Sequence, residues 1–409
     1  MTAHRLDIAM LSFHSCPVGR LGGKDTGGMN VYIRELSRAL GEQGHTVDVY
    51  TRAHDPVEQQ VVELTGNVRL VHLEAGEVNP ITKSAAYSYV DEFARNLERF
   101  RCEHRLGYDL VHSNYWMSGE VGSCLAKSWH VPHITMFHTL GAVKNALGIG
   151  AREPATRIWA ERMLTQDCDR IVCATDKEKE DLQAYYGAAG ERIGVVSCGV
   201  DVERFTPLDR AAARRHLGLD DRPVVLYVGR IESLKGLDRL IRATAQLDGH
   251  RPARVLVVGG DERDRDELQR LARLACELGV EHLVTFEGAV EHSALPLYYN
   301  AADVCAIPSY YESFCMVALE ALACGTPVVG SRVGCIETLV RDGLNGYKLD
   351  DDSPSELAQK LLLALAGLPH DSDGRTRVRG SVQGLAWPVV ARGILEQYRQ
   401  VLPTCAGVA

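Results

Sequence analysis

Two basic residues in the C-terminal half of the chain stand where they could bind a diphosphate. Arg230 follows the apolar run of residues 223–229, and Lys235 lies in the next loop, just before an amphipathic stretch. If that run is a strand of a parallel sheet, both side chains lie at its carboxyl edge, where such sheets bind ligands. Arginine can donate two parallel hydrogen bonds to phosphate oxygens, and lysine adds a compact positive charge. We therefore predict a diphosphate site, with solvated surface charge as the alternative interpretation.

Two glutamates eight positions apart frame an apolar segment further along the chain. Glu312 precedes a predicted helix, and Glu320 lies about two turns inside it, among valine, alanine and leucine residues. A buried carboxylate is costly without a donor, and the hydroxyl groups of a sugar or a ribose could supply one. Backbone N–H groups at residues 313–316, where the helix begins, are also available to a phosphate or a hydroxyl group. A helix cap followed by one solvated glutamate is the alternative.

A glycine-rich loop in the N-terminal half leads directly into a predicted helix. Gly27 and Gly28 stand at the helix entrance, where a backbone without Cβ lets a ligand approach free N–H groups. The positive end of the helix favours an anionic or oxygen-rich group, and a glycine turn without a ligand is the alternative. A Walker A motif is excluded because Asp25 follows the lysine, and the G-x-G-x-x-G pattern is absent. The apolar face of the helix is formed by Met29, Tyr32, Ile33, Leu36 and Leu40.

These residues must be positioned by a fold in which strands and helices alternate. Short apolar runs and amphipathic stretches of about 10 to 16 residues follow one another along the chain. The apolar runs lie at residues 6–13, 46–51, 68–75, 109–114, 132–138, 170–175, 193–198, 223–229, 254–260, 283–288, 303–308, 327–331 and 346–350. Runs of this kind are buried on both faces, which is typical of parallel strands in doubly wound α/β sheets.

The chain is long enough to need two hydrophobic cores. It has 409 residues, and single cores stop growing beyond about 250 to 300 residues. The alternation of strands and helices breaks at residues 200–222, which contain a proline and an acidic turn. We predict two Rossmann-like domains, residues 1–205 and 206–386, that face each other across a cleft, and a terminal helix within residues 387–409. The polar stretch of residues 370–380 is predicted to be a loop.

Composition excludes several classes of partner. The net charge is −9 and the basic residues are dispersed, which argues against nucleic acid. No segment approaches the roughly 18 to 20 apolar residues that a membrane-spanning helix needs, and the N-terminus lacks a signal-peptide cleavage site. The twelve cysteines form no C-x-x-C pair. Scattered cysteines of this kind indicate reduced thiols and a cytoplasmic protein.

The sequence contains no pattern that demands a metal ion. Its short acidic pairs fall in predicted helices, at helix starts or in a polar loop, where capping and solvated charge explain them better than metal binding. Several histidines also lack the spacing of metal ligands. These residues are Asp167 with Asp169, Asp264 with Asp266, Asp371 with Asp373, and the histidines His45, His72 and His292. We predict that no metal ion or other cofactor is required.

Four motifs, taken together and in this order, resemble those of the retaining glycosyltransferases of family 4. They are DTGGMNVYIREL, FHTLG, GRIESLKG and ESFCMVALE, the last with an E-x7-E frame. That family has the GT-B architecture, in which two Rossmann-like domains face each other and a terminal helix crosses back to the first domain. The resemblance covers nearly the whole chain. It implies a hexosyltransferase that uses a nucleotide sugar, most often one linked to UDP.

The resemblance implies a donor site in the C-terminal domain. Arg230 and Lys235 match the pair that binds the donor diphosphate, and Glu320 matches the acid that binds the nucleotide ribose. Glu312 matches the residue that contacts the donor sugar. The implied contacts also include the backbone at Phe314, Cys315 and Met316, the base-binding loop of residues 286–290 with Gly288 and Val290, and Gly27 and Gly28 near the diphosphate.

The resemblance also implies how catalysis proceeds. Retention without a protein nucleophile is explained in this family by attack of the acceptor on the same face, with the leaving diphosphate accepting the proton. The protein then acts by positioning and by stabilising the departing charge. Arg230, Lys235, Glu312 and His138, which matches the active-site histidine near the donor sugar, are the implied catalytic residues. An ordinary core histidine is the alternative interpretation of His138.

Within the family, the chain is most similar to the inositol-phosphate glycosyltransferases of mycothiol synthesis, and next to the sucrose-phosphate synthases. Those relatives bind an acceptor phosphate through a lysine, a tyrosine, a threonine and an arginine. Two cations and two hydroxyl groups suit a phosphomonoester, which carries about −1.5 to −2 charges near neutral pH. The matching residues are Lys83, Tyr115, Thr139 and Arg157, and Asn30 matches the acceptor side of the cleft.

Alternatives remain open at this point. The loop after His14 differs from that of the mycothiol enzymes, and the segment after residues 142–145 is shorter and differently charged. Fructose 6-phosphate or another alcohol could therefore be the acceptor. A binding protein that closes on a sugar nucleotide without reacting, an epimerase and a phosphorylase are the rival functions. The sequence leaves the oligomeric state open, with a homodimer among the candidates.

Overall fold

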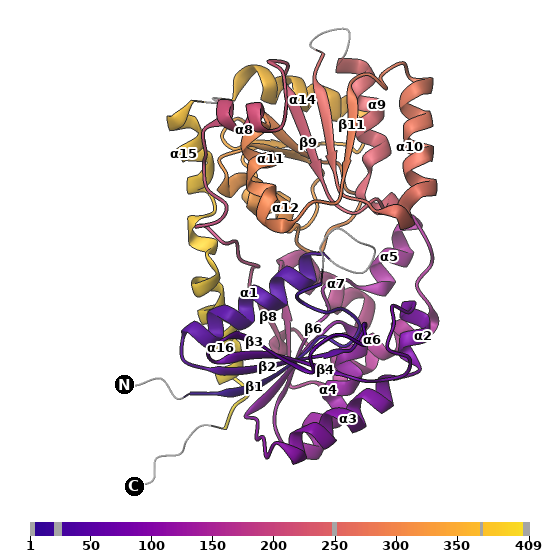
Figure 1. Ribbon diagram of the computed structural model, residues 1–409, viewed down its shortest axis with the longest axis vertical. Coiled ribbons are helices and arrows are strands. Elements are labelled where there is room, and N and C mark those ends of the chain that lie inside the picture. Colours follow the sequence, from indigo (N-terminus) through magenta and orange to yellow (C-terminus); the bar gives the residue numbers. More distant parts are fainter. Residues whose placement is uncertain (1–4, 20–26, 248–251, 369–370, 404–409) are drawn as a thin grey trace.

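The computed structural model describes residues 5–19, 27–247, 252–368 and 371–403. The chain forms two α/β units along the long axis of the molecule, the N-terminal half below and the C-terminal half above in Figure 1. The described residues form one eight-stranded sheet and one six-stranded sheet, one in each unit. The predicted α/β class with two Rossmann-like domains is confirmed.

The N-terminal sheet has the strand order β3-β4-β2-β1-β5-β6-β7-β8. Its neighbouring strands are parallel except for β3 and β4, which are antiparallel. The strands are β1 (Asp7–Leu11), β2 (Thr46–Arg52), β3 (Val61–Thr65), β4 (Val68–Leu73), β5 (Leu110–Asn114), β6 (His133–Met136), β7 (Arg170–Cys173) and β8 (Ile193–Val195). The order reverses at β1, which lies between β2 and β5, and ligands bind beyond the carboxyl ends of strands at such a point.

Strand β3 is missing from the sequence prediction. Its residues are exposed or half-buried, so it lacks the apolar run by which buried strands are recognised. A two-residue loop, Gly66 and Asn67, connects it to β4. Glycine followed by asparagine between two short strands is a hairpin signal, and that signal was the only one available for this edge strand.

The C-terminal sheet is parallel throughout and has the order β11-β10-β9-β12-β13-β14. Its strands are β9 (Val224–Val228), β10 (Arg254–Val258), β11 (Val284–Gly288), β12 (Val304–Ile307), β13 (Val328–Gly330) and β14 (Gly346–Lys348). All six predicted strands of this half are present. Here the order reverses at β9, so the same rule places a ligand beyond the carboxyl ends of β9 and β12.

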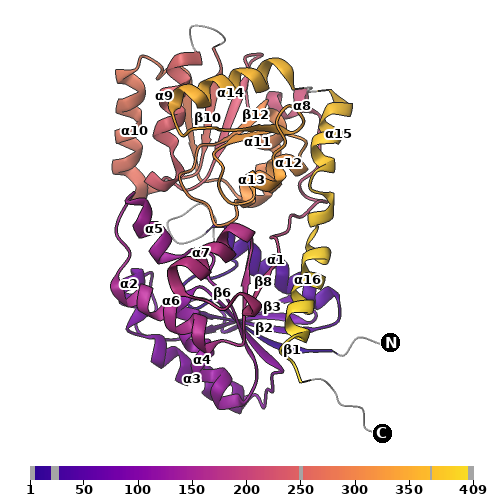
Figure 2. The ribbon, with the colours of Figure 1, turned by 180° about the vertical axis from the view of Figure 1, so that it is seen from behind.

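Helices cover both sheets (Figures 1 and 2). The α-helices are α1 (Gly28–Glu42), α2 (Lys83–Tyr87), α3 (Val90–Glu103), α4 (Trp116–Trp129), α5 (Gly141–Leu147), α6 (Ala155–Asp167), α7 (Asp176–Tyr186), α8 (Arg210–His216), α9 (Leu237–Leu247), α10 (Arg265–Glu277), α11 (Leu295–Ala301), α12 (Met316–Ala323), α13 (Ile336–Leu339), α14 (Pro354–Gly367), α15 (Ser372–Gly380) and α16 (Trp387–Arg399). Single 3-10 turns are η1 (Gly190–Arg192), η2 (Ser233–Lys235), η3 (Glu262–Asp264), η4 (His292–Ala294) and η5 (Gln383–Leu385).

The prediction of a polar loop at residues 370–380 is wrong, because most of this stretch forms helix α15. Asp371 caps the helix by accepting a hydrogen bond from the backbone of Gly374. Arg379 donates to the carbonyl oxygens of Ala323 and Phe205, and Arg375 donates to that of Cys324. Residues 323 and 324 lie at the carboxyl end of α12, where cations are favoured. The polar residues therefore bind the helix to its neighbours, which a polarity pattern alone cannot reveal.

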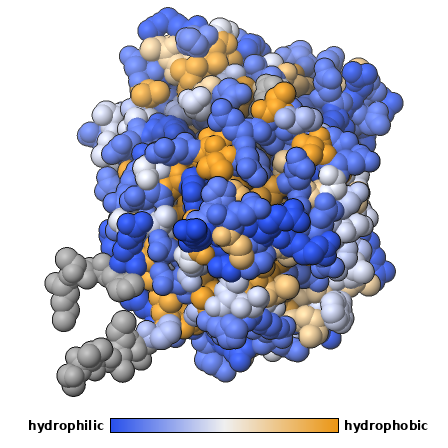
Figure 3. All heavy atoms as spheres, turned by 60° about the horizontal axis from the view of Figure 1, so that its bottom comes forward, coloured by the Kyte–Doolittle hydropathy of each residue, from blue (hydrophilic) through white to orange (hydrophobic). Residues whose placement is uncertain are grey.

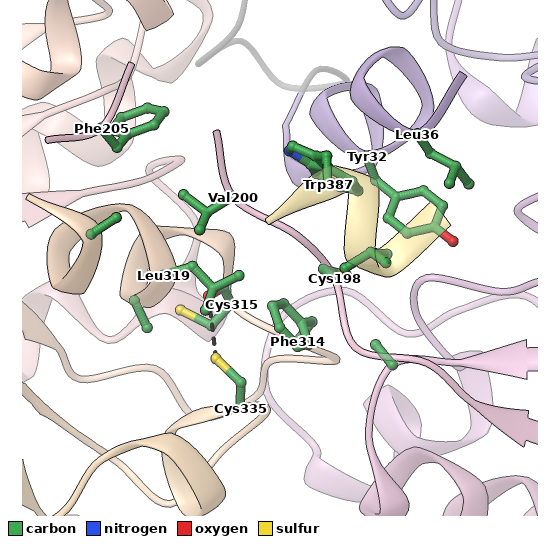
Figure 4. Close-up of a cluster of buried hydrophobic side chains, with 14 of the residues drawn as sticks. Tyr32, Leu36, Cys198, Val200, Phe205, Phe314, Cys315, Leu319, Cys335 and Trp387 are labelled. Carbon is green, nitrogen blue, oxygen red and sulfur yellow. Dashed lines mark hydrogen bonds between the residues drawn. The ribbon is translucent and has the colours of Figure 1, made fainter. Parts of the chain in front are cut away.

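The final helix, α16, packs against α1 and runs along one side of the N-terminal unit (Figures 1 and 2). Its Tyr398 hydroxyl lies 2.6 Å from Nδ1 of the buried His112 in β5. Figure 4 shows the apolar cluster where the two units meet: Tyr32 of α1 and Trp387 of α16 lie near Cys198 in the connecting segment, with Phe314 of the C-terminal unit nearby. One apolar cluster thus includes residues of both units.

None of the described helices combines the length and the apolar character needed to cross a membrane. On the face shown in Figure 3, hydrophobic residues form separate patches among hydrophilic ones. The eleven described cysteines are free thiols, eight of them buried and three exposed. The described cysteines thus agree with the predicted reduced thiols.

Three buried histidines of the N-terminal unit make its stability depend on pH. Burial lowers the pKa values of His112, His133 and His138 from 6.5 to about 3. In the unfolded chain these groups take up a proton near pH 6.5, whereas the folded chain resists protonation down to about pH 3. At these three positions the unfolded state therefore binds more protons below pH 6.5, and the contribution of these histidines to the free energy of unfolding falls as the pH falls.

We expect this contribution to fall between pH 6 and pH 5 by about 1.4 kcal/mol for each such histidine, whereas Glu178, whose pKa burial raises to about 7, acts in the opposite direction. Urea denaturation at pH 7, 6 and 5 measures the slope. The His133→Gln variant, which keeps a polar group beside Ser113, should show a shallower slope than the wild type. Equal slopes for the two proteins would contradict the assignment of His133.

Candidate functional site

A cavity of about 330 Å³ lies between the two units, where the carboxyl ends of both sheets meet. Its walls include residues that follow β1, β5 and β6 on one side and β9, β10 and β12 on the other. This is the position that the strand orders of both sheets favour for a ligand. The predicted site residues in its wall are Gly27, Gly28, Asn30, Lys83, Tyr115, His138, Thr139, Arg157, Arg230, Lys235, Val290, Glu312, Phe314, Cys315, Met316 and Glu320.

Gly288 is the predicted site residue that does not line the cavity. It ends β11 with φ +74°, a backbone conformation that favours glycine. Its carbonyl oxygen accepts a hydrogen bond of 2.8 Å from the backbone of Gly259, which does line the cavity. The residues after the turn, Ala289 and Val290, reach the cavity wall. Gly288 therefore shapes the cavity indirectly, because its conformation permits the turn that places Ala289 and Val290 in the wall.

The two predicted diphosphate cations each lie next to a carboxylate. Lys235 Nζ donates hydrogen bonds of 2.7 and 2.8 Å to the two carboxylate oxygens of Glu312. Arg230 Nη1 lies 2.6 Å from Glu232 Oε1. Gly236, next to Lys235, has φ +65°, and a Cβ there would lie 2.0 Å from the carbonyl oxygen of Pro308. Only glycine fits this close approach, which brings the lysine loop against the end of β12.

Helix α12 begins at the cavity wall. Cys315 precedes its first residue and has φ +88°, a strained conformation for a residue with a Cβ. Met316 and Val317 of its first turn line the cavity, and backbone N–H groups at the start of a helix lack carbonyl partners within the helix. The predicted helix is confirmed, and its N-terminus lies where an anionic or hydroxyl group could bind.

Glu320 is buried, with 4% of its surface exposed, and lines the cavity. The sequence argument assigned it hydroxyl donors from a ligand, and the structure adds two protein partners. His292 Nε2 lies 2.7 Å from Oε1, and the Tyr299 hydroxyl donates a 2.8 Å hydrogen bond to Oε2. Sequence reasoning gave His292 no role, because only metal-ligand spacing was considered, and no spacing rule connects residues 292 and 320.

The glycine entrance of α1 faces the C-terminal unit. A Cβ on Gly27 would lie 3.8 Å from Arg230 Nε, and one on Gly28 would lie 3.2 Å from Met316 Cγ. Asn30 accepts a hydrogen bond from the Gly27 backbone at 2.9 Å and donates to the loop after β1. The bare backbone at residues 27 and 28 thus lies close to the predicted donor site. The rest of the predicted glycine loop, residues 20–26 with Asp25, lies outside the described residues.

His138 is fixed as a neutral side chain in the cavity wall. Its Nε2 lies 2.8 Å from Asn114 Oδ1, which can only accept, so Nε2 carries the hydrogen. Burial lowers the pKa of His138 to about 3. It therefore faces the cavity uncharged at neutral pH. The backbone here has φ +59°, which turns the chain into the cavity wall after β6.

The four predicted acceptor residues lie together at the N-terminal side of the cavity. Arg157 of α6 donates to the Thr139 hydroxyl at 3.0 Å and lies 4.9 Å from the centre of the Tyr115 ring. Lys83 Nζ lies 5.7 Å from the same ring. Two positive charges and two hydroxyl groups are thus brought to one place by residues far apart in sequence.

Arg157 also has carboxylate partners within its own helix and nearby. Its guanidinium lies 2.7 Å from Glu161 and 2.9 Å from Glu153, and the side chain is almost fully buried. These ion pairs fix the orientation of the guanidinium before any ligand binds. Sequence reasoning placed Arg157 in the site and did not reveal that it is held by this buried network.

His14 is a cavity residue that sequence reasoning did not assign. Its ring lies 4.3 Å from that of Tyr115, and its Nδ1 has no hydrogen-bond partner among the described residues. Burial, and next the positive charges of Lys83 and Arg157, hold the pKa of His14 well below its usual value. His14 is therefore neutral at this end of the cavity, beside two cations that attract an anion.

No group of three or more histidine, cysteine or acidic side chains that could hold a metal ion occurs within the described ranges. The requirement for a metal ion is not tested by this finding. The prediction that none is required stays a prediction.

Comparison with known proteins agrees with this geometry. Residues 26–204 match the family described as Glycosyltransferase Family 4, and residues 209–376 match Glycosyl transferases group 1. A D-inositol 3-phosphate glycosyltransferase of Geodermatophilus obscurus is 42% identical over 384 residues, which cover 91% of this chain and 85% of that protein.

Solved structures show the same architecture. Sucrose-phosphate synthase from Thermosynechococcus elongatus has a TM-score of 0.87 and 32% identity, covering 97% of this chain and 99% of that one. HepE of Anabaena in complex with UDP and glucose has a TM-score of 0.76 over 97% of this chain and 100% of that one. At 18% identity, this second likeness concerns the fold alone. The chain therefore belongs to glycosyltransferase family 4 and is a glycosyltransferase with the GT-B fold.

Proposed function

We propose that the protein transfers a hexosyl unit from a UDP-linked sugar to an inositol phosphate, with retention of the anomeric configuration. One observation carries this proposal: the cavity joins a pair of cations in one unit to a second pair, with two hydroxyl groups, in the other. The first pair suits the diphosphate of a nucleotide sugar and the second suits a phosphomonoester. The relative of 42% identity is named a D-inositol 3-phosphate glycosyltransferase, which supports this acceptor.

In this proposal the donor site works mainly by charge. Negative charge develops on the diphosphate as the bond to the sugar breaks, and Arg230 and Lys235 stabilise it. Glu312, which lines the cavity, holds the Lys235 ammonium in place and contacts the donor sugar. Glu320 binds the ribose, and the turn with Ala289 and Val290 binds the base.

The acceptor attacks from the face that the diphosphate leaves, and a diphosphate oxygen accepts the proton of the attacking hydroxyl group. No protein nucleophile takes part, so the protein contributes positioning. Neutral His138 lines the cavity, where it helps to place the donor sugar. Asn30, Lys83, Tyr115, Thr139 and Arg157 place the acceptor.

Sucrose-phosphate synthesis is the second candidate. The sucrose-phosphate synthase structure, with a TM-score of 0.87, supports it. Its acceptor, fructose 6-phosphate, also carries a phosphomonoester, so the same four residues could bind it.

An acceptor screen tests these candidates. UDP-N-acetylglucosamine, UDP-glucose and GDP-mannose are each combined with inositol 3-phosphate, fructose 6-phosphate, inositol or fructose, and release of the nucleoside diphosphate is measured. We expect release with a UDP donor and inositol 3-phosphate, and NMR of the product should show the donor's anomeric configuration. Turnover with fructose 6-phosphate alone would favour the second candidate. Binding without release under every combination would contradict an enzyme.

The remaining predictions concern organisation and location. The division at residues 205/206 and 386/387, and the assignment of donor and acceptor to separate domains, belong to this proposal. The free cysteines suit a cytoplasmic protein. A homodimer stays a prediction, which size-exclusion chromatography with light scattering would test.

A further inference from the structure

His292 connects the cavity to the N-terminal unit. It lies in η4, has 9% of its surface exposed, and packs against the ring of Phe205 at 5.2 Å between ring centres. Its Nε2 lies 2.7 Å from Glu320 Oε1, as described above. Its Nδ1 lies 3.5 Å from Arg34 Nη2 and 3.3 Å from Arg204 Nη1. The ring thus stands between a cavity carboxylate and two guanidinium groups.

These neighbours fix the position of the ring hydrogen. A guanidinium group can only donate hydrogen bonds, so Nδ1 accepts from the arginines. Nε2 then carries the hydrogen and donates it to the carboxylate of Glu320. The hydrogen bonds therefore run in one direction, from the arginines through the imidazole to Glu320.

The two arginines come from parts of the chain outside the C-terminal sheet. Arg34 belongs to α1 of the N-terminal unit, and Arg204 belongs to the segment that connects the units. Both lie near the buried carboxylate of Glu35, with contacts of 3.0 Å for Arg34 and 3.8 Å for Arg204. Neither arginine lines the cavity. Arg34 is therefore linked to the cavity through its contact with His292.

Glu320 keeps hydrogen-bonding capacity after these contacts. Each of its two oxygens accepts one protein hydrogen bond, from His292 and from Tyr299. A carboxylate oxygen has two lone pairs, so one site on each oxygen remains for a ligand. A carboxylate held at both oxygens is preorganised, because little side-chain freedom is left to lose on binding.

We propose that Arg34, Arg204 and His292 form an interdomain relay that positions the Glu320 carboxylate for the ribose hydroxyl groups of the nucleotide. His292 and Arg34 are then positioning residues for the donor. The relay rests on the proposed binding of ribose by Glu320. It makes nucleotide affinity depend on the placement of α1, so that the acceptor-side unit contributes to a site in the donor-side unit.

The test compares UDP with 2′,3′-dideoxy-UDP, which lacks the hydroxyl groups that Glu320 would bind. Calorimetry gives the affinity of each nucleotide for the full-length wild type and for His292→Leu, His292→Gln, Arg34→Leu and Arg38→Leu. We expect the wild type to prefer UDP. His292→Leu should lower this preference about tenfold, since a hydrogen bond to a charged group contributes about that much. A general loss of structure would weaken both nucleotides equally and leave the preference unchanged.

Three further variants sharpen the result. His292→Gln should restore most of the preference, because its amide can donate to Glu320 and accept from an arginine. Arg34→Leu should lower the preference in the same direction by a smaller factor. Arg38→Leu is the matched control: Arg38 lies one turn further along α1, is half exposed, bonds to Glu42 at 2.9 Å and, like Arg34, lies near Glu35, at 3.9 Å. It should bind both nucleotides as the wild type does.

Glu320→Gln separates failure of the relay from failure of the ribose assignment. If this variant keeps the wild-type preference for UDP, Glu320 does not bind the ribose and the proposed donor site is wrong. If Glu320→Gln loses the preference while His292→Leu and Arg34→Leu keep it, the ribose assignment stands and the relay is overturned. Arg34→Leu removes a side chain that is 25% exposed, and Glu35 keeps its contacts with Arg38 and Arg204, so this variant decides the matter if His292→Leu fails to fold.

Discussion

Replacing Arg230 or Lys235 with alanine is expected to lower kcat/KM by about 30- to 1000-fold, which corresponds to about 2 to 4 kcal/mol of transition-state stabilisation. Both side chains line the cavity at the carboxyl edge of the C-terminal sheet, where the leaving diphosphate would gain negative charge. Their effect should appear in kcat as well as KM, because that charge is greatest in the transition state. Steady-state rates of nucleoside diphosphate release measure both constants.

The Lys235 variant should show the larger loss of the two. Lys235 neutralises Glu312, whose side chain is only 12% exposed. Without the ammonium, an unpaired carboxylate remains in the cavity and repels the diphosphate. Adding Glu312→Gln to Lys235→Ala should therefore cost less than the sum of the two single losses, as expected for residues in direct contact.

Arg270→Ala is a suitable control for the loss of a positive charge. It lies on α10 of the same unit, is half exposed and pairs with Glu267 within the helix. Its kcat/KM should equal that of the wild type. If Arg230→Ala and Lys235→Ala also retain wild-type kcat/KM, the diphosphate does not bind at these cations and the donor assignment fails.

The sequence was sufficient to predict the strands and helices whose burial appears as runs or regular spacings of apolar residues. The strands that end before Arg230 and before His138 are runs of apolar residues, because parallel strands are covered on both faces. Helix α1 was predicted from the spacing of its apolar face, and Tyr32, Ile33 and Leu36 are indeed buried. The positions of the site residues then follow from topology, since residues after these strands meet at one edge.

The features that were missed depend on contacts between distant residues. Helix α15 contains polar residues because Arg375 and Arg379 bind carbonyl oxygens more than fifty residues away. The proposed role of His292 depends on its contacts with Glu320, Arg34 and Arg204. Neither the periodicity nor the spacing of residues in the sequence shows that these four side chains meet. A single sequence shows which residues are apolar, and it does not show which polar side chains find partners inside the fold.

Mutation of Arg157 would not test the acceptor site, because this residue also stabilises the fold. Arg157 is almost fully buried and pairs with Glu161, whose side chain has no exposed surface. Removing one partner of a buried ion pair commonly costs about 3 to 5 kcal/mol of stability. Arg157→Ala should therefore unfold more easily than the wild type in urea, so a loss of its activity would not identify the acceptor.

Lys83 gives the cleaner test. It is half-buried at the start of the short helix α2, whereas Arg157 is almost fully buried, and Lys83 Nζ lies 5.7 Å from the centre of the Tyr115 ring. We expect Lys83→Met to raise KM for a phosphorylated acceptor about 10- to 100-fold, because a charge-assisted hydrogen bond contributes about 1.5 to 3 kcal/mol. Its kcat should change little, since the phosphate is remote from the reacting hydroxyl group.

The decisive measurement is the difference between phosphorylated and plain acceptors, followed as release of the nucleoside diphosphate. Lys127→Met serves as the control, because Lys127 is an exposed lysine of the same unit that pairs with Asp167 on the surface. Lys83→Met should lose affinity for inositol 3-phosphate and keep whatever rate the wild type shows with inositol. Equal losses with both acceptors would mean that Lys83 supports the cavity without contacting the phosphate. The two cations beside Tyr115 would then have to be explained by the buried network of Arg157 alone.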